Sequence, residues 1–135
     1  MRNLQKAAQQ GFTMIELIVV IVILGVLAAT ALPKFFDLGS DAKAAALQGV
    51  AGAANSAMSL NYGGCAVVGN VVTANKCVKI RNCNEVPNIL QGGLPTGYTV
   101  ANLAIAAIGT NEPACTITQT AGGATATFTG IGAGT

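Results

Sequence analysis

Two sets of residues in this sequence could carry chemistry, namely four cysteines and one isolated glutamate. The cysteines are Cys65, Cys77, Cys83 and Cys115. Four thiolates that bind a metal usually include Cys-x-x-Cys pairs, and these spacings contain none. In an oxidising compartment the same residues would form two disulfides, for which three pairings are possible. We favour Cys65–Cys77 within one loop and Cys83–Cys115 between that loop and a sheet, and we expect no metal site.

The glutamate is Glu16, the single charged residue between Phe12 and Leu32. A carboxylate at the centre of a bilayer costs about 2.5–3.5 kcal/mol, and less near the headgroups. Glu16 therefore either lies at the level of the lipid headgroups or pairs with a positively charged group of its own chain or of a neighbouring chain. A cut before Phe12 would create an α-amino group four residues away. Opposite charges at that range attract strongly where water is excluded, so the pair could control assembly.

The composition narrows the possible functions. The sequence of 135 residues has no histidine, which excludes histidine-based acid/base catalysis and His-ligated metals. Only 9 % of the residues are charged, compared with about 25 % in ordinary soluble domains. The net charge of +2 is too small for electrostatic binding of nucleic acid. We therefore expect neither an enzyme, nor a bound cofactor, nor a nucleic-acid partner.

The segment from Phe12 to Leu32 is long enough to span a membrane. Its 21 residues make a helix of about 31 Å, close to the thickness of the hydrocarbon core. Residues 1–11 are short and polar, with Arg2 and Lys6 as their charges, which favours a cytoplasmic N-terminus. A secretory signal is the alternative, with small residues for cleavage at 26–31. The run exceeds the 7–15 residues of such signals, so an anchor is favoured.

The rest of the chain predicts that this helix continues beyond Pro33 and is followed by a small head. Apolar and small residues recur at helical spacing to about Tyr62, where Gly63 and Gly64 are expected to end the helix. The head, residues 63–135, is rich in Gly, Asn and Thr. Asn82 or Asn84 could cap a brief helix, and three strands are predicted at 98–107, 115–120 and 125–131. An antiparallel sheet on the long helix gives an α+β fold.

The string Gly11-Phe12-Thr13-Met14-Ile15-Glu16, followed by LIVVIVILGVLAATALP, resembles the N-terminus of type IV prepilins. The resemblance implies that a prepilin peptidase removes residues 1–11 after Gly11, that Phe12 is then N-methylated, and that Glu16 acts in assembly. It also implies the pilin-like fold, with a hydrophobic helix at 12–33, an amphipathic helix at 34–62 and a head at 63–135. Residues 33–63 are more loosely similar to mannose-sensitive-haemagglutinin-type pilins.

Gly25 and Pro33 also match positions in that family, where they bound a helical segment that loosens in the filament. A glycine inside a helix costs about 1 kcal/mol and a proline about 3 kcal/mol relative to alanine. In lipid the helix must stay closed because unpaired backbone groups are costly there. A static kink at this point is the alternative.

The resemblance implies a major structural subunit of a type IV pilus that polymerises with copies of itself into a helical filament. It further implies an inner-membrane precursor, an assembly platform as partner, and an extracellular filament for adhesion or surface motility. Two other functions remain open at this point. One is a pseudopilin of a type II secretion or DNA-uptake system, and the other is a monomeric, membrane-anchored binding protein.

Overall fold

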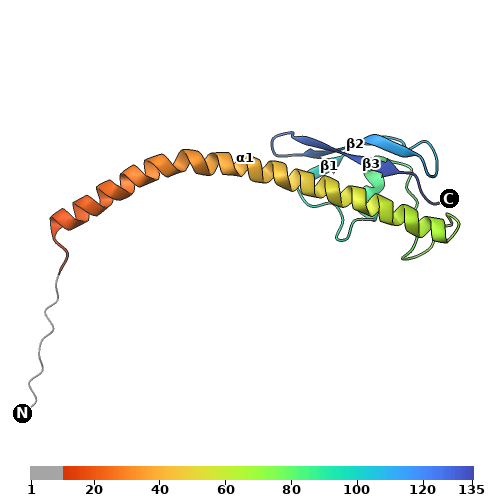
Figure 1. The fold of residues 1–135 in the computed structure, drawn as a ribbon, viewed down its shortest axis with the longest axis horizontal. Helices are drawn as coiled ribbons and strands as arrows, with labels where there is room; N and C mark the ends of the chain where they lie inside the picture. The colour runs from red at the N-terminus through yellow and green to blue at the C-terminus, as the bar shows by residue number, and fades with distance from the viewer. Residues whose placement is uncertain (1–10) are drawn as a thin grey trace, which may run out of the picture. The chain divides into compact units, whose positions relative to one another are not determined.

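The structure is a computed structural model that describes residues 11–135, apart from the side chains of residues 33–37. The described chain divides after Ser40 into two compact units. Its elements, in chain order, are α1 (Met14–Val67), the 3-10 helix η1 (Cys83–Asn88), and the strands β1 (Tyr98–Val100), β2 (Asn111–Gln119) and β3 (Thr125–Ile131) (Figure 1). The expected α+β class, with a long N-terminal helix and a small antiparallel sheet, is confirmed.

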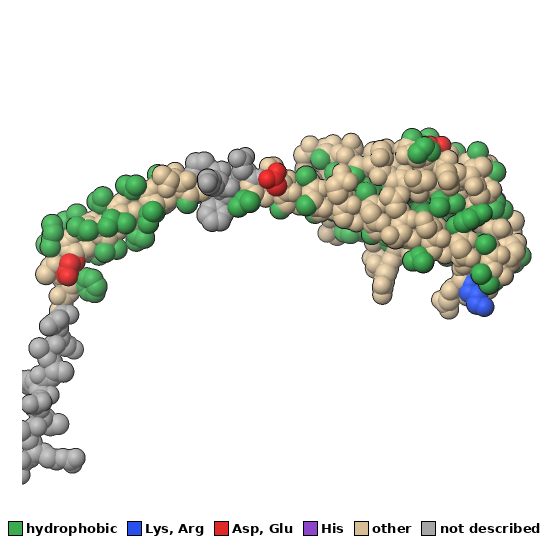
Figure 2. Space-filling view, in the orientation of Figure 1, with side chains coloured by type: hydrophobic (Ala, Val, Ile, Leu, Met, Phe, Trp, Pro, Cys, Tyr) green, Lys and Arg blue, Asp and Glu red, His purple; other side chains and the backbone are tan. Residues whose placement is uncertain are grey.

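The first unit is the apolar part of α1. Residues Met14–Leu32 have a mean hydropathy of 2.8, and none of this segment is buried inside the chain. Its length and composition suffice for a helix that crosses a membrane. The large hydrophobic side chains from Phe12 to Leu32 are 46–84 % exposed, and Figure 2 shows hydrophobic side chains at the surface along this segment. Such a surface requires lipid or other protein around it.

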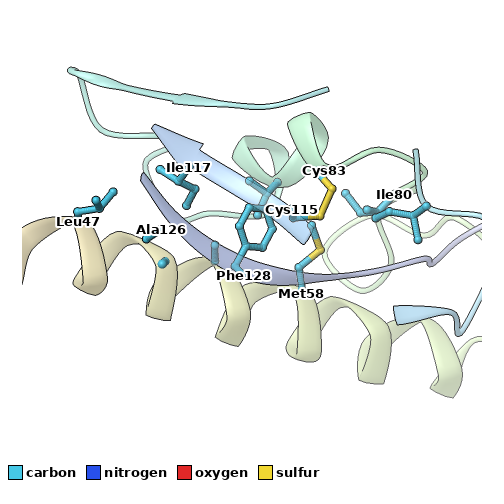
Figure 3. Packing of buried hydrophobic residues seen from close by; sticks show 12 residues of the cluster. Leu47, Met58, Ile80, Cys83, Cys115, Ile117, Ala126 and Phe128 are labelled. Carbon is cyan, nitrogen blue, oxygen red and sulfur yellow. A yellow bond between two sulfur atoms is a disulfide. The ribbon is translucent and has the colours of Figure 1, made fainter. Parts of the chain in front are cut away.

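The second unit, residues 41–135, has a core between α1 and the sheet. The buried side chains of α1 recur every three or four residues, which places them along one face of the helix. They are Leu47, Ala51, Ala54, Met58, Asn61 and Cys65. Residues from the sheet, among them Ile117 and Phe128, complete the same cluster (Figure 3). Alanines along the helix let the sheet come close to the helix backbone.

The sheet is antiparallel, with the strand order β1-β2-β3. Cys115 is paired with Phe128 and Ile117 with Ala126, and all four are buried on the face towards α1. A register shift between Glu112 and Cys115 marks a bulge in β2, where Pro113 lies. Because side chains alternate between the two faces of a strand, the threonines between these positions face outward.

The predicted end of the long helix is wrong. The helix passes Gly63 and Gly64 and ends at Val67. Close packing requires a glycine at position 64 instead, because a Cβ on Gly64 would collide with the backbone carbonyl oxygen of Lys76. The glycine thus marks where the loop after the helix crosses the last helical turn. In the sequence, a glycine of this kind near a helix end looks the same as a glycine that caps the helix.

The prediction for residues 98–107 is too long, since β1 covers only Tyr98–Val100. After Ala101 the backbone leaves β2 and bonds to residues 81–83, at the start of η1. The Cys83 N–H donates to the Leu103 carbonyl, and the Ile105 N–H donates to that of Arg81, both at 2.8–2.9 Å. The predicted brief helix is present as η1, with Asn82 at its cap.

Candidate functional site

Thr13 and Glu16 form a capping box at the start of α1. Glu16 Oε2 accepts hydrogen bonds from the Thr13 hydroxyl at 2.7 Å and from the Thr13 N–H at 2.9 Å. The Glu16 N–H donates to Thr13 Oγ1 at 3.4 Å. This reciprocal pairing caps the N-terminal end of α1, so Gly11 and Phe12 lie before the helix. The role of Thr13 was not predicted, although its spacing from Glu16 just before an apolar run is a known signal.

The surroundings of Glu16 are apolar. A hollow of about 360 Å³ beside it is lined by Phe12, Ile15, Val19 and Val20. Among the residues that the structure describes, no basic group forms an ion pair with the Glu16 carboxylate. Arg2 and Lys6 lie outside the described residues. An exposed carboxylate in an apolar surface, held only by a threonine, can accept a cationic partner from outside the helix.

The helix is continuous through Gly25, and a Cβ there would meet no other group within 4 Å. The Thr30 hydroxyl donates to the carbonyl oxygen of Leu27 at 3.0 Å and of Val26 at 3.3 Å. The Thr30 hydroxyl therefore gives these two carbonyl oxygens, which lie within two helical turns before Pro33, an additional hydrogen-bond donor. The Pro33 side chain lies outside the described residues. Loosening of this segment on assembly stays a prediction.

Two disulfides join distant parts of the head, Cys65 to Cys77 and Cys83 to Cys115. These are the two pairings favoured from the sequence, and no cysteine is left free. Cys65 lies in the last turns of α1 and Cys115 on β2, and all four residues are fully or almost fully buried. Since every thiol is in a disulfide, these residues cannot serve as thiolate ligands for a metal.

Two asparagines of α1 hold the head backbone to the helix. The Asn61 side chain donates from Nδ2 to the Val78 carbonyl oxygen at 2.8 Å and accepts from the Val78 N–H at 2.9 Å. Asn55 Oδ1 accepts from the Thr129 N–H on β3 at 2.8 Å. Neither contact was predicted, because their partners lie 17 and 74 residues away in the chain. Polar bonds and disulfides together fix the head on α1.

The sequence matches the family model of the prokaryotic N-terminal methylation motif over residues 6–32. The match includes Gly11, Phe12, Thr13 and Glu16. The match therefore covers the apolar part of α1 and the residues just before this helix, and it does not extend into the head.

Two curated proteins are similar to this chain. The type IV narrow pilus major component PilA5 of Thermus thermophilus is 33 % identical over 120 residues, which is 88 % of this chain and 93 % of that protein. The fimbrial protein EcpC of Eikenella corrodens is 42 % identical over 57 residues, 42 % of this chain and 37 % of that protein. No solved structure gives a significant match. Given the methylation motif, an exposed apolar helix, a disulfide-linked α+β head and a relative that is aligned over most of both chains, the protein belongs to the type IV pilins.

Proposed function

We propose that this pilin is made as an inner-membrane precursor, cut between Gly11 and Phe12 by a prepilin peptidase and N-methylated at Phe12. A pilus assembly platform then adds it to an extracellular filament as the major subunit. The observation that carries the proposal is the exposed helix Met14–Leu32, whose N-terminal end is capped by Thr13 and Glu16 shortly after the proposed cleavage position. Before assembly this surface would be covered by lipid, and afterwards by copies of the same helix.

The cut would supply the partner that Glu16 lacks. Cleavage before Phe12 creates an ammonium group next to Thr13, whose N–H and hydroxyl already bond to the Glu16 carboxylate. In a filament interior from which water is excluded, the ammonium of one chain can pair with Glu16 of the same chain or of a neighbour. Because the precursor has an amide at this position, the pair can form only after cleavage. Processing and assembly would thereby be linked.

The charge balance of the processed chain suits dense packing. Removal of residues 1–11 would take away Arg2 and Lys6, which leaves five basic and five acidic side chains. Heads of near-zero net charge can pack against one another without long-range repulsion. We propose that the resulting filament serves adhesion or movement on surfaces, and the likeness to a pilus component and a fimbrial protein supports this proposal.

The experiment that tests this function is the intact mass of the protein in filaments sheared from cells. The expected mass begins at Phe12, carries one added methyl group and lacks four hydrogens, corresponding to two disulfides. Immunogold labelling of the same preparation should decorate the filaments along their length. A mass that begins at Met1, found only in membranes, would overturn the proposal and favour an anchored monomer. Labelling only at filament tips would exclude the role of major subunit.

A further inference from the structure

A groove runs along one flank of α1 in the head. It consists of two adjoining cavities of about 670 Å³ and 260 Å³, which share Ala53, Leu90 and Gln91. The helix side is built mainly from small residues, from Ala46 to Ala57. The opposite wall consists of the segment 88–95 together with Asn75, Lys76 and Val78. Leu60 lies at one end and is 76 % exposed. The groove is therefore open and apolar at its base, and a partner can come close to the helix backbone.

The rim of the groove can bind a neutral polypeptide. Its amide side chains Asn75, Asn88 and Gln91 make no hydrogen bond to other described residues, so their donors and acceptors are available to a partner's backbone. Lys76 is the single charged residue among those that line the two cavities. An apolar base with amides on the rim favours an uncharged segment that carries aliphatic side chains.

A segment of this chemistry lies on the same head, at the turn that follows α1. Val67, Val71 and Val72 are 83 %, 59 % and 50 % exposed, and residues 66–75 contain no charge. We call residues 67–72 the valine knob. Its shape is fixed, since the Asn70 N–H donates to the Cys65 carbonyl at 2.7 Å and the Asn70 carbonyl accepts from Thr135. A rigid apolar turn loses little entropy when it binds.

We propose that the groove receives the valine knob of a second copy of this chain within the filament. The inference rests on the proposed function. An open helical polymer requires a heterologous contact, in which two different surfaces of each copy meet. The groove and the knob are such a pair. Along the rigid helix, Ala53 and Val67 are separated by about 21 Å. A chain therefore cannot place its own knob in the middle of its own groove, and the occupant must come from another copy.

Two substitutions test the two surfaces separately. Ala53→Trp would fill the groove, and Val71→Asp would place a charge on the knob. Each is expected to lower the amount of filament at least about tenfold, as burial of an unpaired charge or loss of the contact implies. Ala45→Trp is the matched control, because Ala45 is exposed on α1 but does not line the groove. It should leave the amount of filament unchanged.

The measured quantity is the sheared filament relative to cut, methylated chain in the membrane. Intact mass shows whether each variant is processed and whether both disulfides have formed. If the unmodified protein forms no filaments, the proposed function fails. If it forms filaments and both Ala53→Trp and Val71→Asp do so equally well, the groove assignment alone is overturned.

A crosslink identifies the occupant even if one of these variants does not fold. A photoreactive benzoylphenylalanine in place of Val71 should, in intact filaments, join residues 46–60 or 88–95 of another copy. Peptide mapping of the crosslinked dimer locates the site. Crosslinks confined to other surfaces, or to a different protein, would overturn the proposal.

Discussion

The side-chain amide of Asn61 pairs with both backbone polar groups of Val78, as donor at 2.8 Å and as acceptor at 2.9 Å. Asn61 is only 9 % exposed, so water competes weakly for these bonds. The contact lies between α1 and the segment that joins the two disulfides. It therefore fixes this segment against the helix in the same way that a neighbouring strand would.

Asn61→Ala should lower the free energy of unfolding by about 2–3 kcal/mol, because two partly buried backbone groups lose their partner. Asn55→Ala is the matched control, since the exposed Asn55 side chain accepts a hydrogen bond from the Thr129 N–H. Loss of this bond should cost about 1 kcal/mol. Thermal unfolding of the full chain in detergent measures both. Equal effects would show that burial of Asn61 does not determine its contribution.

Gly64→Ala should destabilise the head by about 1–3 kcal/mol, because the added methyl group collides with the Lys76 carbonyl oxygen. Gly63→Ala, one residue earlier in the same helix, meets nothing within 4 Å. It should stabilise the helix by up to about 1 kcal/mol. The two melting temperatures should thus move in opposite directions. A parallel shift would contradict the close approach of the loop to α1.

The two disulfides should differ in their contribution. Chain-entropy estimates give about 3 kcal/mol for Cys65–Cys77, with a separation of 12, and about 4 kcal/mol for Cys83–Cys115, with a separation of 32. Cys83 and Cys115 also belong to the main core cluster, whereas Cys65 and Cys77 form a smaller one. Replacing each pair by alanine should therefore lower the melting temperature more for Cys83 and Cys115. The reverse order would count against this assignment.

Glu16→Gln should block filament formation while processing continues. Glutamine keeps an oxygen that can accept the hydrogen bonds from Thr13, but it removes the charge that would pair with the new α-amino group. The ratio of cut chain in the membrane to chain in sheared filaments should rise strongly. Glu112→Gln, the same change on a head carboxylate that bonds to the Ala114 N–H, should leave the ratio unchanged. Normal filaments from Glu16→Gln would refute an electrostatic role.

Thr13→Val should loosen the first turn of α1, since valine has the shape of threonine without its hydroxyl. Loss of the cap costs about 1 kcal/mol, and Thr13→Ser should retain most of it. Hydrogen exchange of the Glu16 and Leu17 amides in detergent should be faster in the valine variant alone. Equal exchange in both variants would mean that the hydroxyl does not hold the turn.

Features set by local sequence were predicted well. The apolar run, the cap at Asn82 (one of the two asparagines expected there) and the last strand, Thr125–Ile131, depend on periodicity and on nearby residues. The α+β class followed from the order of these elements. The helix end was misplaced, because Gly64 serves a contact with Lys76 that no local pattern encodes.

Features set by distant contacts were harder to predict. The strand from Tyr98 stops at Val100 because its backbone then bonds to residues 81–83, which sequence alone does not bring near. Asn61 looks like any polar residue on a helix, and only the fold reveals its pairing with Val78. Thr13 differs from these residues, since its spacing from Glu16 just before an apolar run is a local signal of a capping box.

The disulfides also set how far a head can be stretched under load. A chain pulled between α1 and its C-terminus can extend only through segments that no covalent loop encloses. The loops closed by Cys65–Cys77 and Cys83–Cys115 have sequence separations of 12 and 32. At about 3.5 Å per residue, the disulfides prevent about 40 Å and about 110 Å of chain from extending. A head in which both disulfides are reduced would gain these lengths, and it should therefore extend further under the same load than the oxidised head.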